Sequence, residues 1–204
     1  SNELTLIRFM ESDQPDEILT IWSIYRPTDD EIEETLKLEL VIENTDTENA
    51  LKTFKNGDDI GIVSSFNYDY NGMEHYIYHY GRQTGKLNVF EYSFIDGKLK
   101  LLLSKTISEI FNAYEELTTD FDTDYVDFFK ISGVYANDIK LTYLYITVYY
   151  KNTIYVAEYS PIMYTEGTSF ETSAKPLVGI KLQYLDTYCA YNKGGTLTQE
   201  LIIV

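Results

Sequence analysis

The sequence predicts an all-β protein built from antiparallel hairpins, on three observations. Aromatic residues make up 15% of the 204 residues, and 20 of them are tyrosine. Tyrosine, like the β-branched residues that are also frequent here, fits a pleated and half-buried strand. Short turn signals separate several runs of such residues. Finally, the stretch that starts at Ile60 resembles the stretch that starts 67 residues further on, at Asp127.

The first half of the chain carries two predicted elements before the hairpins begin. Apolar and more polar residues alternate over Leu36–Glu43, which predicts a strand with one apolar face. Thr47–Lys55 follows as a predicted short helix, because Asn56-Gly57 supplies a typical stop signal.

Three hairpins are predicted from their turns. Their central residues are Asp96-Gly97, Lys151-Asn152 and Gly194-Gly195. Asp-Gly favours a type I′ turn because that turn needs a positive φ at both central residues. The three turns join Leu87–Ile95 to Lys98–Lys105, Leu141–Tyr150 to Thr153–Tyr159, and Asp186–Tyr191 to Thr196–Val204.

One helix is predicted after the first of these hairpins. Thr106 and Glu109 have the spacing of a capping box, in which each side chain bonds the other residue's free backbone N–H. Apolar residues then recur at helical spacing, which predicts a helix over Ile107–Leu117.

The internal repeat is the most informative feature of the sequence. Ile60–Ser93 overlays Asp127–Ser160 without a gap, and eight of the 34 positions are identical. The sharpest part is the ending, Asn88-Val-Phe-Glu-Tyr-Ser93 against Tyr155-Val-Ala-Glu-Tyr-Ser160. Coincidence in a tyrosine-rich chain is one explanation, and a repeated sheet of three or four strands is the other.

The repeat suggests an architecture. A single all-β domain over 1–204, with candidate units at 60–105 and 127–160, has the spacing of β-propeller blades of about 50–67 residues. On this interpretation the chain is either whole or a piece of a longer propeller. A two-sheet β-sandwich would show the same density of strands and is the close alternative.

Charge and composition exclude several classes of function. The 33 acidic and 16 basic residues give a formal net charge of −17, which would repel nucleic acid and anionic lipid. No apolar run is long enough for a membrane span, and the single cysteine, Cys189, cannot form an internal disulfide. The chain is expected to be soluble, and its start at Ser1 is compatible with a processed secreted or lipoprotein chain or with a cloning scar.

Metal and catalytic patterns are weak. Asp120, Asp122 and Asp124 alternate and suit a hard cation such as calcium, but they lack the glycine and glutamate of a calcium-binding loop. His75 and His79 share a strand face without completing a metal site. No nucleophile–base pair and no phosphate-binding loop is apparent, so no catalytic residue and no cofactor is expected.

The tyrosines of the repeat suggest a binding face. Tyr76, Tyr78, Tyr143 and Tyr145 lie in the paired hairpins, where they either stabilise the sheet by cross-strand packing or face outward as an aromatic platform. The sequence therefore predicts a non-enzymatic protein-interaction or scaffold module whose partner has a basic face. The alternatives are an all-β carbohydrate-binding or carbohydrate-processing domain, with a glycan as ligand, and a structural subunit of a virion or cell surface.

Overall fold

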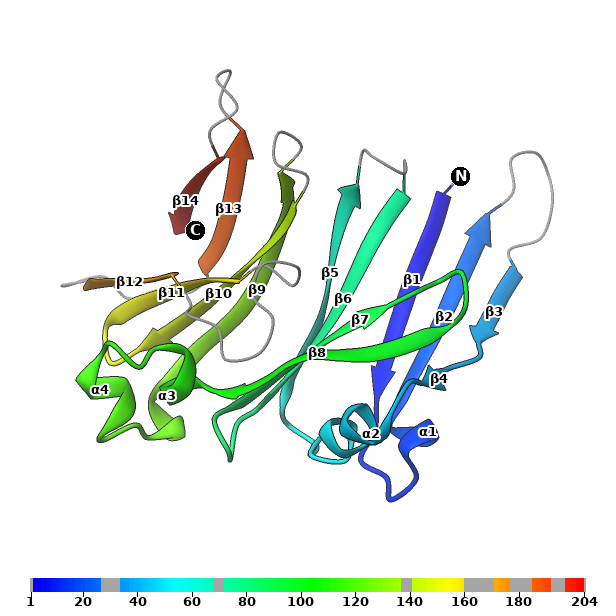
Figure 1. The fold of residues 1–204 in the computed structure, drawn as a ribbon, viewed down its shortest axis with the longest axis horizontal. Coiled ribbons are helices and arrows are strands. Elements are labelled where there is room, and N and C mark those ends of the chain that lie inside the picture. The colour runs from blue at the N-terminus through cyan, green and yellow to red at the C-terminus, as the bar shows by residue number, and fades with distance from the viewer. Residues whose placement is uncertain are drawn as a thin grey trace.

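The structure of the chain is a computed structural model that describes residues 2–26, 34–67, 72–136, 141–159, 171–176, 185–191 and 197–203. Fourteen strands, four short α-helices and one 3-10 turn fall within these ranges. The prediction of an all-β protein is confirmed, since the strands form four sheets and the helices are short connections between them. In Figure 1 the sheets stand side by side and the helices lie along their lower ends.

Sheet A is an antiparallel meander of three strands in the order β1-β2-β3. It comprises β1 (Asn2–Phe9), β2 (Leu19–Arg26) and β3 (Glu34–Leu38). The short helix α1 (Pro15–Ile18) lies between β1 and β2 and has its proline in the first turn, where the missing N–H costs nothing.

Sheet B has five strands in the order β4-β8-β7-β6-β5. Its strands are β4 (Val41–Ile42), β5 (Asp59–Asn67), β6 (Gly72–Gly81), β7 (Lys86–Tyr92) and β8 (Lys98–Thr106). The predicted strand Leu36–Glu43 is therefore split: β3 pairs with β2 in sheet A, whereas β4 crosses over and pairs in parallel with β8.

Helix α2 (Thr45–Leu51) connects β4 to β5. It begins two residues before the predicted helix Thr47–Lys55, because the Asn44 side chain accepts a hydrogen bond from the backbone N–H of Thr47 at 2.9 Å and caps the helix. It also ends four residues earlier than predicted.

Sheets C and D complete the fold. Sheet C has four strands in the order β12-β11-β10-β9, and sheet D is the antiparallel pair β13-β14. Their strands are β9 (Val126–Ala136), β10 (Leu141–Tyr150), β11 (Thr153–Tyr159), β12 (Glu171–Pro176), β13 (Leu185–Tyr191) and β14 (Leu197–Ile203).

The predicted hairpins form, but not all of their turns are as predicted. Lys151 and Asn152 both have positive φ, 43° and 62°, so this two-residue turn is confirmed. At Asp96-Gly97 only Gly97 has a positive φ, and the loop is longer because Ser93 N–H bonds the Lys98 carbonyl oxygen. The hairpin β13-β14 is confirmed, and its turn at Gly194-Gly195 lies outside the described residues.

The predicted helix Ile107–Leu117 is broken into α3 (Ile107–Ile110) and α4 (Glu115–Thr118), followed by the 3-10 turn η1 (Thr123–Tyr125). The capping box between Thr106 and Glu109 is present as predicted. The helix stops because Phe111 leaves the helical region, with ψ of 41°. Phe111 and Tyr114 instead place their rings against the ring of Tyr155, at 5.8 and 5.2 Å.

Two apolar clusters join the sheets in chain order. One cluster packs sheet A and α2 against one face of sheet B, with Ile21, Leu51 and Ile77 fully buried in it. The other packs the opposite face of sheet B against sheet C, with Tyr80, Leu144 and Ile146 at its centre. Sheet B is thus enclosed between its neighbours, which explains why its strands carry apolar residues on both faces.

The two segments of the sequence repeat both form antiparallel strands, in β5 to β7 and in β9 to β11. Strands β7 and β11 start and end 67 residues apart and have the same burial pattern, with four consecutive buried residues. The preceding strands are offset by two further residues, because the β6-β7 turn spans four residues, 82–85, and the β10-β11 turn spans two. Tyr145, rather than Tyr143, therefore lies opposite Glu158 as Tyr76 lies opposite Glu91.

None of the four sheets closes on itself among the described residues. The structure thus establishes an all-β protein of stacked sheets. In the part of the chain that the structure describes, no helix combines the length and the apolar composition that crossing a membrane requires.

Candidate functional site

The four tyrosines of the predicted aromatic face lie mostly inside the protein. Tyr76, Tyr143 and Tyr145 are 4%, 9% and 1% exposed, so the outward orientation predicted for them is wrong. Tyr78 is half-buried and packs its ring 5.9 Å from that of Phe129. Burial raises the pKa of the Tyr78 hydroxyl. For Tyr76 the physical reason is that sheet B lies between sheets A and C, so that its strands have no outward face.

His79 lies in a buried polar network on the face of sheet B that meets sheet A. Its Nε2 is 2.7 Å from Asp58 Oδ2, and its Nδ1 is 3.2 Å from the Asn88 amide nitrogen. Since an amide nitrogen can only donate, the imidazole accepts at Nδ1 and donates from Nε2 to the carboxylate. The Asn88 amide also donates to Thr53 Oγ1, and its oxygen accepts from Ser104 Oγ. Both ring nitrogens of His79 and both the nitrogen and the oxygen of the Asn88 amide thus have hydrogen-bond partners within the chain. Such full pairing is typical of a buried polar network that stabilises the fold.

Burial lowers the pKa of His79, although the hydrogen bond to Asp58 acts in the opposite direction. The unfolded chain then binds a proton near the ordinary value of 6.5, while the folded chain does so only at lower pH. The stability that His79 contributes is fully present above pH 6.5 and is lost as the pH falls.

We therefore expect a pH dependence that His79→Gln removes. Between pH 7.5 and 5.5 the wild type should lose stability relative to the variant, with a limiting slope of about 1.4 kcal/mol per pH unit. Urea unfolding of both proteins across this range measures the difference. Parallel curves would show that His79 does not titrate differently in the folded and unfolded chains.

The other histidine forms a contact that the sequence did not reveal. Ser64 and His75 are cross-strand partners in β5 and β6, and Ser64 Oγ is 2.8 Å from His75 Nδ1. A serine beside an imidazole is one part of a nucleophilic site. Ser64, however, lies within the regular β5-β6 ladder and not on a turn that would place its hydroxyl over free backbone amides. We assign no catalytic role to this pair.

The three aspartates proposed for a metal do not converge. The Asp122 carboxylate accepts a hydrogen bond from Asp124 N–H at 3.0 Å and caps η1, while the Asp120 carbonyl oxygen accepts from the Tyr150 hydroxyl. Within the described part of the chain, no group of three histidine, cysteine, aspartate or glutamate side chains is placed to hold a metal ion.

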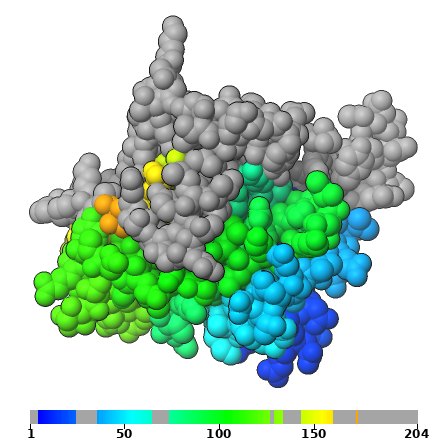
Figure 2. Space-filling model, viewed as in Figure 1, coloured from blue at the N-terminus to red at the C-terminus, as the bar shows by residue number. Residues whose placement is uncertain are grey.

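These aspartates instead belong to an exposed acidic surface, which we name the α3–η1 surface. From Thr106 to Phe129 the sequence has seven acidic residues and no lysine or arginine. The six of them between α3 and η1 are exposed. They are Glu109, Glu115, Glu116, Asp120, Asp122 and Asp124. In Figure 2 this segment, in yellow-green, forms the lower left of the molecule.

An ammonium group and two aromatic rings lie at the edge of the α3–η1 surface. Lys151 Nζ is 4.8 Å from the ring centroid of Tyr125 and 5.0 Å from that of Tyr150. Tyr125 is 53% exposed. A hydrogen bond with Tyr150, together with the nearby negative charge of Asp120, raises the pKa of Lys151. The site therefore stabilises a cation through aromatic faces and carboxylates together.

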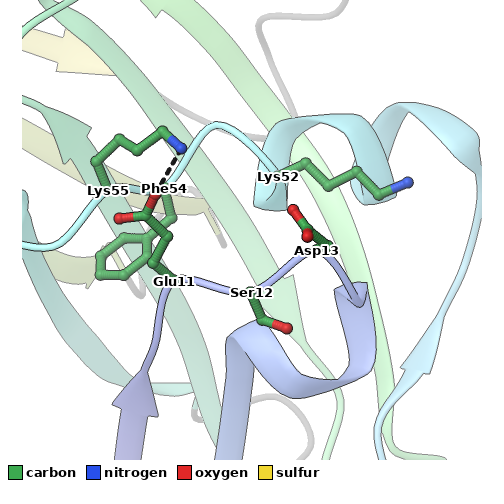
Figure 3. A pocket seen from close by; sticks show the side chains of 6 residues that line it. All are labelled: Glu11, Ser12, Asp13, Lys52, Phe54 and Lys55. Atoms are coloured by element: carbon green, nitrogen blue, oxygen red, sulfur yellow. Dashed lines mark hydrogen bonds and ion pairs between the residues drawn. The ribbon is translucent and has the colours of Figure 1, made fainter.

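A polar pocket of about 480 Å³ lies at the other end of the molecule, between the segment after β1 and the end of α2 (Figure 3). Lys55 forms an ion pair with Glu11 at 2.7 Å, and this hydrogen bond lowers the pKa of Glu11. Lys52 pairs with Glu48, outside the pocket. Both lysines are thus already neutralised by carboxylates of the chain, so we propose no ligand for this pocket. Its lining residues are Glu11, Ser12, Asp13, Lys52, Phe54 and Lys55.

Comparison of the sequence with protein-family models and with curated proteins finds no match.

Proposed function

We propose that the chain is a non-enzymatic interaction module that binds a basic surface of a protein partner at the α3–η1 surface. The observation that supports this most directly is the position of Lys151, whose ammonium group lies over Tyr125 and Tyr150 beside exposed carboxylates. A lysine or arginine of a partner would replace Lys151 over these rings, where the same aromatic faces and the exposed carboxylates stabilise a cation. The net charge of −17 would speed the approach of such a partner.

We propose further that the stacked sheets are blades of a propeller-like scaffold that presents this surface. Three features support the proposal over a two-sheet sandwich. The sheets follow one another in chain order, with sheet B packed on both faces. The first strand of sheet B, β5, lies along the first strand of sheet C, β9, which in turn lies along β13. Finally, β7 and β11 have the same length and burial pattern.

A lysine-rich peptide tests the proposed binding function. Removing three charges from the α3–η1 surface, by Glu115→Gln, Asp120→Asn and Asp124→Asn together, should weaken binding of a fluorescein-labelled lysine-rich peptide about tenfold or more. None of these three side chains makes a hydrogen bond or ion pair within the described structure. The folded chain should therefore keep its melting temperature. Fluorescence anisotropy at physiological ionic strength measures the affinity.

The matched control removes three charges from the opposite side of the molecule. Glu39→Gln, Glu43→Gln and Asp46→Asn give the same net charge, and these residues lie around β4 and the start of α2. This variant should bind the peptide within about twofold of the wild type. Equal losses in both variants would mean that the peptide senses only the overall charge, and the proposed site would be wrong.

A further inference from the structure

Among the described residues, sheet A has no counterpart of the strand that begins the meanders of sheets B and C. In sheets B and C the meanders start with β5 and β9, and Figure 1 draws these two strands and β13 pointing the same way. Strand β1 points the opposite way, as the second strands β6 and β10 do. By direction and order, β1, β2 and β3 therefore match the second, third and fourth strands of the later meanders.

The missing position lies at the free edge of β1. Strand β5 packs along β9, and β9 along β13, whereas β1 touches β5 only slightly. Strand β2 is the one described strand that pairs with β1. A first strand for sheet A would continue the row of β5, β9 and β13.

The backbone groups at this edge can be identified. Met10 N–H donates to the Ile18 carbonyl oxygen at 2.8 Å, so Met10 and every second residue before it bond toward β2. Alternation along an antiparallel ladder then directs the N–H and C=O groups of Thr5, Ile7 and Phe9 to the free edge. The unpaired backbone N–H and C=O groups of these three residues form a template with which an added strand can pair.

The edge of β1 also lacks the usual protection against pairing. Of the other outer strands, β4 is only two residues long and β12 ends in Lys175-Pro176, whereas β5, like β1, is long and has neither lysine nor proline. Strand β1 has eight residues and no proline or lysine. Apolar side chains flank the edge on both faces, because Ile7 and Phe9 pack into the core while Leu6 is 44% exposed.

We propose that the free edge of β1 is a strand-binding site for an extended segment of a partner protein that carries apolar side chains on both faces and runs antiparallel to β1. The segment would form the missing first strand of sheet A. Its backbone would bond Thr5, Ile7 and Phe9, and its side chains would extend the apolar surfaces on both faces of the sheet. This site is separate from the α3–η1 surface, so each proposal can fail without the other.

Amide hydrogen exchange tests the edge in the chain itself. In the protein alone, the amides of Thr5, Ile7 and Phe9 should exchange much faster than those of Leu6 and Arg8, which bond β2. Equal protection of both sets would mean that the edge is already occupied, and the proposal would be wrong.

Peptide binding tests the proposed occupant. The probe is a synthetic peptide with the sequence of β5, Asp59–Asn67, which fills the corresponding position in sheet B. It should slow exchange at Thr5, Ile7 and Phe9 and change the emission of the single tryptophan, Trp22, which lies opposite Leu6. Alternate N–H groups of a bound strand point to opposite edges. N-methylation of the amides that face β1 should therefore abolish binding, whereas N-methylation of the amides that face away should preserve it. A peptide that does not bind, or that binds in both methylated forms, would contradict strand addition.

A pair of variants locates the binding to this edge. Thr5→Pro removes an N–H that points away from β2, at an edge position where proline is tolerated, and should weaken peptide binding at least tenfold. Thr5→Val keeps the N–H and should bind as the wild type does. Equal binding by both variants would exclude the β1 edge. A Thr5→Pro protein that still binds the lysine-rich peptide shows that the α3–η1 surface is intact.

Discussion

Tyr80→Ala is expected to lower the free energy of unfolding by about 3–5 kcal/mol, the range found for large aromatic side chains deleted from a core. Tyr80 is fully buried between sheets B and C. Its ring lies parallel to that of Phe129, with 4.4 Å between the centroids and 9° between the planes. The alanine variant would leave a cavity at the contact that joins the two sheets. Urea or thermal unfolding measures the loss.

The conservative variant Tyr80→Phe should have the opposite effect. The Tyr80 hydroxyl oxygen is buried without a hydrogen-bond partner, and burial raises its pKa far above the ordinary value. A buried hydroxyl without a partner costs about 1–3 kcal/mol, so its removal should leave the protein as stable as the wild type or about 1 kcal/mol more stable. A clear loss of stability in Tyr80→Phe would mean that the hydroxyl is hydrogen-bonded in solution.

The sequence predicted the strands better than it predicted their environment. Alternation and turn residues are local signals, and they located β10 and β11 to the residue. Whether a strand is covered on one face or on both depends on how distant segments stack. Tyr145 illustrates this: its neighbours along the chain do not show that the side chain is 1% exposed. The outward face predicted for the tyrosines failed for that reason.

Tertiary contacts also overrode local preference at the predicted helix. Its capping box formed as the sequence indicated, but the helix gave way to a turn at Phe111. Packing of Phe111 and Tyr114 around Tyr155, a residue more than forty positions away, favours the broken geometry. A helical spacing of apolar residues reports that they are buried together, and two short helices can bury them as well as one long helix.

The candidate site was visible in the sequence only in part. Of the acidic residues of the α3–η1 surface, the sequence singles out only Asp120, Asp122 and Asp124 as weak metal candidates. The approach of Lys151 to Tyr125 joins residues 26 positions apart and depends on the β10-β11 turn, where two positive φ angles direct the lysine back over the rings. No sequence pattern predicts that a lysine in the β10-β11 turn contacts a tyrosine in η1, which precedes β9.

The Asp58–His79 pair should be the most sensitive polar contact of the described structure. Asp58 accepts hydrogen bonds from His79 Nε2 at 2.7 Å, from Lys55 N–H at 2.9 Å and from Arg82 N–H at 3.0 Å. Its side chain is 4% exposed. Asp58→Ala would leave the buried His79 Nε2–H without an acceptor and would also remove the acceptor of the part-buried Arg82 N–H, so we expect a loss of about 3 kcal/mol in the free energy of unfolding.

The neighbouring residue provides the matched control for this prediction. Asp59 carries the same charge and pairs with Arg82 through Nε at 2.8 Å, but the two side chains are 29% and 42% exposed. Asp59→Ala should therefore cost about 1 kcal/mol, less than Asp58→Ala, since an ion pair that is partly open to solvent contributes little. Asp58→Asn, which keeps one acceptor oxygen, should lie between the two in chemical denaturation. Similar losses for Asp58→Ala and Asp59→Ala would show that the network around His79 stabilises the fold no more than a surface ion pair does.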